Sequence, residues 1–95
     1  KAVPTTWDET RFIDGYPGKY VVLARRHGDT WYLAAVNAGK EPLKLRLDLD
    51  MFAGKTVSQY KDDKKGEPQL VPLKVKENGK VQLEIRPQGG ILCIK

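Results

Sequence analysis

The most constraining feature of this sequence is a strict alternation of leucine with charged residues. Residues 43–49 read Leu-Lys-Leu-Arg-Leu-Asp-Leu, which places four leucines on one side of an extended chain and three charges on the other. Residues 81–86, Val-Gln-Leu-Glu-Ile-Arg, repeat the pattern. A helix would scatter these apolar residues around its circumference, because its period is 3.6 residues. Both segments therefore predict β-strands with one buried and one solvated face.

Turn-forming residues divide the chain into seven predicted strands at intervals of about 8 to 12 residues, the spacing of a sandwich or barrel. The connections are too short for crossover helices, so we expect antiparallel pairing in two facing sheets with Greek-key-like topology. The sequence thus predicts an all-β antiparallel sandwich that forms a single domain over residues 1–95. The expected strands are 19–26, 30–38, 43–49, 55–62, 70–76, 81–86 and 91–95, with a polar loop at 63–68.

Three local signals refine the expected pairing. Gly28 lies in a short polar turn, which predicts a hairpin between the strands on either side. Asn78-Gly79 predicts a second tight hairpin, because both central positions of such a turn favour positive φ. Pro72 has no backbone N–H to donate, so strand 70–76 is expected at the edge of a sheet.

The N-terminal segment departs from the alternation. Residues 6–9 are compatible with a capped helical turn and residues 10–13 with a short extended piece, so we expect irregular structure over residues 1–15. Large apolar side chains nevertheless occur in this segment and are candidates for a contact with the end of the sandwich or with a neighbouring domain. These candidates are Trp7, Phe12 and Ile13.

Composition excludes several classes of protein. Hydrophobic residues make up 40% and charged residues 31%, which is the balance of a chain that folds. The net charge of +5 does not indicate nucleic-acid binding, because basic residues are interleaved with acidic ones and form no cluster with aromatic residues. No window approaches the roughly 20 apolar residues of a membrane helix, so we expect no membrane insertion. Since the chain begins at Lys1, we expect a cut through a longer polypeptide or a processed end.

The sequence offers no evident catalytic or metal-binding constellation. Asp8 and Glu9 are adjacent, so they point to opposite sides of an extended chain and differ from the spaced carboxylate pair of a glycosidase. The only histidine, His27, falls beside the predicted hairpin tip. The single cysteine, Cys93, excludes an internal disulfide and a thiolate cluster, and its apolar neighbours predict a packed core thiol. We therefore predict no catalytic residue, no metal and no cofactor in this chain.

Sugar binding is an alternative function, because exposed aromatic rings of a sandwich can stack on saccharides. Trp31 and Tyr32 are consecutive in a predicted strand, so they face opposite sides. We expect one of them in the core and the other under neighbouring side chains. An independent carbohydrate-binding module, or an adhesion or assembly sandwich of an exported protein, stays open as an alternative. The aromatic candidates are Trp7, Tyr16, Tyr20, Trp31, Tyr32 and Tyr60.

Three segments near the N-terminus resemble a known family. Residues 4–11 read Pro-Thr-Thr-Trp-Asp-Glu-Thr-Arg, residues 18–26 read Gly-Lys-Tyr-Val-Val-Leu-Ala-Arg-Arg, and residues 28–37 read Gly-Asp-Thr-Trp-Tyr-Leu-Ala-Ala-Val-Asn. Together they resemble the C-terminal region of glycoside hydrolase family 97 enzymes. From Leu43 onward the likeness is only a succession of strands.

The resemblance implies a domain plan with an N-terminal β-sandwich, a central (β/α)8 barrel that holds the catalytic carboxylates and calcium, and a C-terminal β-sandwich. Such enzymes act on α-glucosides or α-galactosides and are mostly exported bacterial proteins, often periplasmic. The resemblance then implies that this chain is the non-catalytic C-terminal domain, that its partner is the preceding barrel of the same polypeptide, and that it contributes to contacts between copies of the enzyme. No position here matches the catalytic or calcium-binding residues of the family, so calcium is expected only in the catalytic domain.

Overall fold

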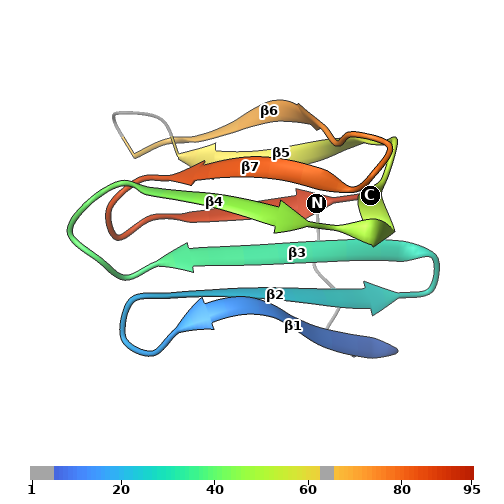
Figure 1. Ribbon diagram of the computed structural model, residues 1–95, viewed down its shortest axis with the longest axis horizontal. Coiled ribbons are helices and arrows are strands. Elements are labelled where there is room, and N and C mark those ends of the chain that lie inside the picture. Colours follow the sequence, from blue (N-terminus) through green and yellow to red (C-terminus); the bar gives the residue numbers. More distant parts are fainter. Residues whose placement is uncertain (1–5, 63–65) are drawn as a thin grey trace.

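The computed structural model describes residues 6–62 and 66–95, and it is an all-β sandwich (Figure 1). All seven predicted strands are present, so the predicted fold class is confirmed. Residues 1–5, and residues 63–65 of the predicted polar loop, lie outside the described part. The elements are β1 (Glu9–Tyr16), β2 (Tyr20–His27), β3 (Thr30–Asn37), β4 (Leu43–Asp48), the 3₁₀ turn η1 (Asp50–Phe52), β5 (Thr56–Asp62), β6 (Pro68–Lys74), β7 (Lys80–Ile85) and β8 (Gly90–Ile94).

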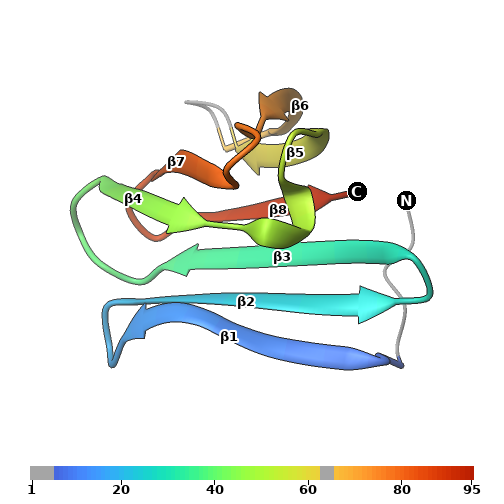
Figure 2. The ribbon, with the colours of Figure 1, turned by 45° about the vertical axis from the view of Figure 1, so that its right-hand side comes forward.

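Two antiparallel sheets form the sandwich. The large sheet has six strands in the order β1-β2-β3-β8-β5-β6, and the small sheet pairs β4 with β7. The pairs β3·β8, β4·β7 and β5·β6 are nested in the sequence, as in a long two-stranded ribbon that folds back on itself, and β8 then joins β5. This is the Greek-key-like connectivity that the short connections predict. Figures 1 and 2 show the small sheet lying over the middle of the large one.

The N-terminal segment corrects one expectation. Irregular structure was expected over residues 1–15, but β1 pairs with β2 from Glu9↔Arg26 to Tyr16↔Tyr20, and no helical turn forms at residues 6–9. A β-bulge between Phe12 and Asp14 explains why the strand is hard to recognise. The extra residue breaks the two-residue alternation of side chains, so the period that marks the other strands is absent here.

A second correction concerns the turn at Gly79. Asn78-Gly79 predicts a hairpin, but the strands on either side of it belong to different sheets, since β6 pairs with β5 and β7 pairs with β4. Gly79 does adopt positive φ, 82°, and its carbonyl accepts a hydrogen bond from the Leu49 N–H at 2.8 Å. The turn therefore carries the chain between the sheets and packs against the end of β4. Local turn chemistry set the reversal but not the pairing partner.

The other two local predictions are confirmed. Strands β2 and β3 form a hairpin whose register closes at His27↔Thr30. Gly28 has φ 60°, which is the conformation that favours glycine at the first central position of a tight hairpin turn. Strand β6 is the edge of the large sheet, as the proline at position 72 predicts.

The core lies between the small sheet and the inner face of the large sheet, by which we mean the side turned toward β4 and β7. Leucines at alternate positions of β4 are buried as predicted, and Phe52 from η1 fills the space beside them. Cys93 is fully buried in β8, which confirms the predicted core thiol, and burial raises its pKa to about 12. The core side chains are Val22, Ala24, Leu33, Ala35, Leu45, Leu47, Leu49, Phe52, Val57, Val75, Leu83, Ile85, Ile91 and Cys93.

One buried polar side chain ties the two sheets together. Asn37, at the end of β3, is only 3% exposed. Its amide nitrogen donates to the carbonyls of Glu41, Ile85 and Arg86 at 2.8, 3.2 and 3.2 Å, and its Oδ1 accepts from the Gly39 N–H at 2.9 Å. The large sheet is thereby fixed to the end of β7 and to the connection that leads into β4.

Candidate interaction surface

The large sheet has an outer face, the side turned away from β4 and β7, and this face exposes several large apolar side chains. Large hydrophobic residues lie on it with unusually high exposure: Phe12 is 67% exposed, Leu70 is 55% exposed and Val36 is 49% exposed. Val21 of β2 adds a further exposed apolar side chain. The charged Arg25 and the polar His27 lie on this face at the other end of β2. Exposed apolar side chains gathered on one face are typical of a contact with another folded body.

Two shallow hollows give this face relief. One, of about 320 Å³, lies at the β1–β2 turn, and its lining includes Phe12, Tyr16 and Val21. The other, of about 270 Å³, lies where β3, β8 and β5 meet, and its lining includes Tyr60 and Leu92. Val36 borders both hollows, so it lies on the ridge between them. Because polar groups are scarce in both linings, the hollows suit apolar side chains better than a sugar.

The N-terminal end of the described chain lies across this same outer face. The Trp7 ring packs edge-on against Tyr32, with ring centroids 5.2 Å apart, and the Arg25 guanidinium lies 5.4 Å from the centroid of the Trp7 ring. Nδ1 of His27 lies 3.0 Å from the Thr6 carbonyl oxygen. Tyr32, Arg25 and His27 all point outward by the alternation of their strands. The chain therefore reaches β1 by crossing the outer face.

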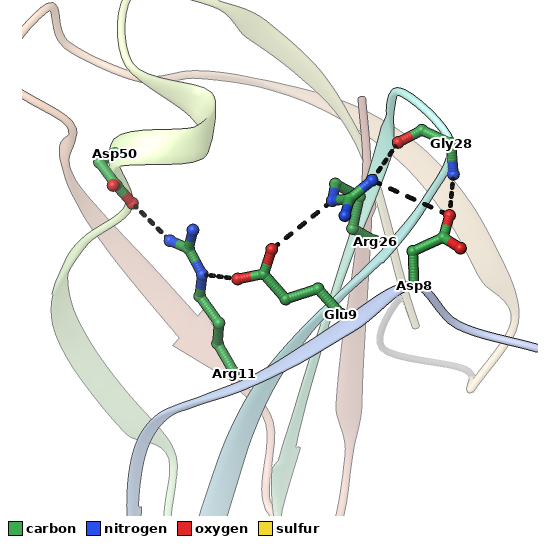
Figure 3. A network of polar contacts seen from close by, with 6 residues as sticks. All are labelled: Asp8, Glu9, Arg11, Arg26, Gly28 and Asp50. Carbon is green, nitrogen blue, oxygen red and sulfur yellow. Dashed lines mark hydrogen bonds and ion pairs between the residues drawn. The ribbon is translucent and has the colours of Figure 1, made fainter.

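A polar network occupies the other side of β1, where the small sheet does not extend (Figure 3). The Arg26 guanidinium donates to the Gly28 carbonyl at 2.9 Å and lies 3.8 Å from an Asp8 oxygen and 3.6 Å from a Glu9 oxygen. Asp8 in turn accepts from the Gly28 N–H at 2.7 Å. Glu9 also pairs with Arg11.

Arg11 extends the network toward η1. Its guanidinium lies 3.5 Å from an Asp50 oxygen and 4.8 Å from the centroid of the Trp31 ring. The hydrogen bond from Arg11 is the main cause that holds the pKa of Glu9 below its ordinary value, and the charge of Arg26 acts in the same direction. The same hydrogen bond raises the pKa of Arg11. Glu9 is thus held ionised by neighbouring arginines, which suits a structural ion-pair network rather than acid catalysis.

The aromatic residues that could have formed a saccharide platform are divided between the two faces. Trp31 packs against the core from the inner face, whereas Tyr32 is only 8% exposed on the outer face under Trp7, which confirms that one ring is in the core and the other is covered. Tyr20 donates from its hydroxyl to Asp14 at 3.2 Å, and its burial, followed by the charge of Asp14, raises its pKa. Most of these rings are therefore engaged in contacts within the domain.

The groups that could carry chemistry are dispersed. His27 is exposed at the hairpin tip and lies on the outer face, while Cys93 faces the core. Among residues 6–62 and 66–95, no three His, Cys, Asp or Glu side chains gather as ligands of a metal would. In the same residues, no helix has the length and apolar character needed to cross a membrane.

The three predicted interface candidates take different places. Phe12 lies exposed on the outer face, and Trp7 is half-buried on the same face against Tyr32. Ile13, at the bulge, packs against the core of this domain, which accounts for its apolar side chain. A role of these residues in an interface with another domain stays a prediction.

Other residues of the outer face were missed from the sequence. The signal was present in the runs Val21-Val22-Leu23 and Leu33-Ala34-Ala35-Val36, which are apolar without alternation. Continuous apolar strands are typical of sheets covered on both faces. With one face of these strands in the core of the sandwich, the other was predictable as a surface that a partner covers.

Comparison with known proteins gives a consistent picture. Residues 6–94 match the family model "Glycosyl-hydrolase 97 C-terminal, oligomerisation". The retaining alpha-galactosidase of Bacteroides thetaiotaomicron is 28% identical over 95 residues, which is 93% of this chain and 14% of that protein. The chain thus spans only a small part of this relative.

Solved structures agree with that assignment. The crystal structure of a beta-arabinopyranosidase superposes with a TM-score of 0.94 at 90% identity, over 98% of this chain and 15% of that one. A glycoside hydrolase family 97 enzyme from Pseudoalteromonas sp. strain K8, solved in complex with acarbose, superposes with a TM-score of 0.75 at 27% identity, over 97% of this chain and 16% of that one.

Proposed function

The chain belongs to the glycosyl-hydrolase 97 C-terminal family, and from that premise we propose that it is the non-catalytic accessory domain of a larger glycoside hydrolase. Its role is to dock on the catalytic domain of the same polypeptide, to stabilise that domain, and to contribute to contacts between copies of the enzyme. The matched family model describes an oligomerisation domain.

The apolar outer face is the observation that carries this proposal. A sandwich that functions alone would place polar side chains on the open side of its large sheet, as this chain does on the open side of its small sheet. Instead Phe12, Val36 and Leu70 are exposed there. Burying such side chains stabilises a contact by roughly 25 cal/mol per Å² of apolar surface.

For the parent enzyme we propose hydrolysis of terminal α-galactosides or of β-arabinopyranosides. The support is the likeness to an alpha-galactosidase and the 90% identity to a beta-arabinopyranosidase. The two sugars are chemically close, because a β-L-arabinopyranosyl ring has the hydroxyl configuration of an α-D-galactosyl ring and lacks only its hydroxymethyl group. Calcium binding and export to the periplasm, where they occur, would be properties of the parent enzyme.

An activity assay tests the non-catalytic role. The 95-residue chain and its parent enzyme are compared on nitrophenyl α-galactopyranoside and nitrophenyl β-L-arabinopyranoside. We expect turnover by the parent and none by the chain alone. Turnover by the isolated chain would contradict the proposal.

A second measurement separates this function from carbohydrate binding. The isolated chain is titrated with galactose, arabinose and maltooligosaccharides while tryptophan fluorescence is followed. Because Trp7 and Trp31 are engaged with Tyr32 and Arg11, we expect no saturable change. A saturable response would favour a carbohydrate-binding module.

A further inference from the structure

We propose that the outer face of the large sheet is the docking surface for the domain that precedes this chain in the same polypeptide. Contacts between copies of the enzyme then use other surfaces. This inference rests on the proposed accessory function and goes beyond it, because it assigns one surface to one partner. The outer-face set that carries it is Phe12, Val21, Val36 and Leu70.

The route of the chain is the first argument. This domain is a C-terminal one and covers about 14–16% of its relatives, so most of the parent polypeptide comes before residue 1. That polypeptide enters at Thr6 and Trp7, which are held on the outer face by His27, Tyr32 and Arg25. The preceding domain is therefore connected to this chain through a segment, Thr6 and Trp7, that lies on this face.

Connectivity is the second argument. A domain of the same polypeptide is held near the outer face by its covalent connection, which raises its effective concentration there. A second copy of the enzyme competes from bulk solution and has no such advantage. An apolar face beside this connection is thus occupied first by the connected domain.

The size of the face is the third argument. Six strands about 4.8 Å apart, with up to eight residues each at about 3.3 Å per residue, span on the order of 600 Å². An interface between domains of one chain buries about 600–1,500 Å² in total, half of it from each side. The outer face is therefore large enough to supply one side of such an interface.

The small sheet supplies the contrast. Its open side presents Lys44, Arg46, Gln82 and Glu84, all of them exposed, in the alternation that the sequence predicts. Covering these charged side chains with an apolar partner would remove their hydration, which costs free energy. The two open sides of the sandwich thus differ in chemistry, and only the outer face suits apolar side chains that would enter its two hollows.

Thiol labelling of the parent enzyme tests the assignment. Val36→Cys places a reactive thiol on the ridge between the hollows, and Gln82→Cys is the matched control on the small sheet. Native Cys93 should not be labelled, because it is buried and burial raises its pKa to about 12. Labelling with a maleimide is followed residue by residue through the masses of the proteolytic peptides, for the parent enzyme and for the 95-residue chain.

We expect Val36→Cys to react readily in the isolated chain and about tenfold or more slowly in the parent, since labelling there must wait for local opening of the interface. The protection should be the same at all enzyme concentrations. Gln82→Cys should react equally in both proteins. Leu70→Cys, on the edge strand β6 of the same outer face, should repeat the result of Val36→Cys.

Two outcomes would overturn the inference. Equal labelling of Val36→Cys in chain and parent would mean that the outer face is open. Protection that disappears on dilution, in step with dissociation of an oligomer seen by light scattering, would assign the face to a second copy. Both outcomes leave the accessory function standing, because that function fails instead through glycosidase turnover by the isolated chain. Thermal unfolding of each variant of the isolated chain verifies that it folds.

Discussion

Trp7 lies edge-on against Tyr32, with their ring centroids 5.2 Å apart and their planes inclined by 73°. This contact joins the N-terminal segment to the outer face of the large sheet and covers a tyrosine that would otherwise be exposed.

Replacing Trp7 tests how much this contact stabilises the domain. Trp7→Ala removes the edge contact with Tyr32 and the ring beneath Arg25, so we expect a loss of about 1–2 kcal/mol in the free energy of unfolding. Urea denaturation followed by circular dichroism measures it. Trp7→Phe keeps an aromatic edge and should recover most of the loss. Equal stability of Trp7→Ala and the unchanged chain would show that the segment is not held to the sheet.

Asn37 should be among the least replaceable polar residues. Asn37→Ala leaves the carbonyls of Glu41, Ile85 and Arg86 without this donor, and we expect a loss of about 2 kcal/mol or more. Asn37→Asp should be at least as harmful, because a carboxylate would face carbonyl oxygens in a buried place. The control is Asn78→Ala, whose exposed side chain accepts from the Lys80 N–H, with an expected loss below about 1 kcal/mol. Similar losses for both positions would contradict the role given to Asn37.

Gly79 tests the turn between the two sheets. It has φ 82°, and a Cβ there would lie 3.0 Å from an Asp48 carboxylate oxygen and 3.2 Å from the Leu49 backbone. Gly18 has a similar φ of 75° with nothing within 4 Å, so Gly18→Ala measures the backbone strain alone. We expect about 1 kcal/mol for Gly18→Ala and about 2–3 kcal/mol for Gly79→Ala in chemical denaturation. Equal losses would mean that the close approach to β4 is unimportant.

The ion pairs of Glu9 predict an acid-dependent part of the stability. The pKa of Glu9 is lower in the folded chain than its ordinary value of 4.5, mainly through the Arg11 hydrogen bond. Its contribution is therefore fully present above pH 4.5 and is lost as the pH falls through the folded-state pKa. Glu9→Gln should be slightly less stable than the unchanged chain at neutral pH, and the difference should vanish in acid.

Thermal unfolding across the acid range measures the effect of Glu9. High salt should shrink the difference at neutral pH, since the pairs are exposed. Glu41→Gln, at an exposed position of the β3–β4 connection, serves as the control for removing a carboxylate. A difference that persists unchanged in acid would mean that the effect of Glu9→Gln does not come from its charge.

The sequence by itself determined the strands from β2 to β8. In residues 43–49, for example, a two-residue period leaves one arrangement that buries the leucines and solvates their charged neighbours. It also predicted the core position of Cys93 and the hairpin at Gly28, since both depend on residues close in the chain. The continuous apolar runs in β2 and β3 carried the signal for the apolar side chains of the outer face.

Tertiary structure alone decided which strands pair. Asn78-Gly79 reverses the chain, but β7 pairs with β4 rather than with β6. Burial of the apolar faces of β4 and β7 against the large sheet stabilises the fold more than hydrogen bonds between β6 and β7 would. Tertiary structure also decided the pairing of β1. The bulge at Ile13 breaks the two-residue alternation of this strand, and β1 forms by adding to the free edge of β2. The meeting of Trp7 with Tyr32 and of Asn37 with Ile85 likewise depends on contacts between distant residues, which no local pattern encodes.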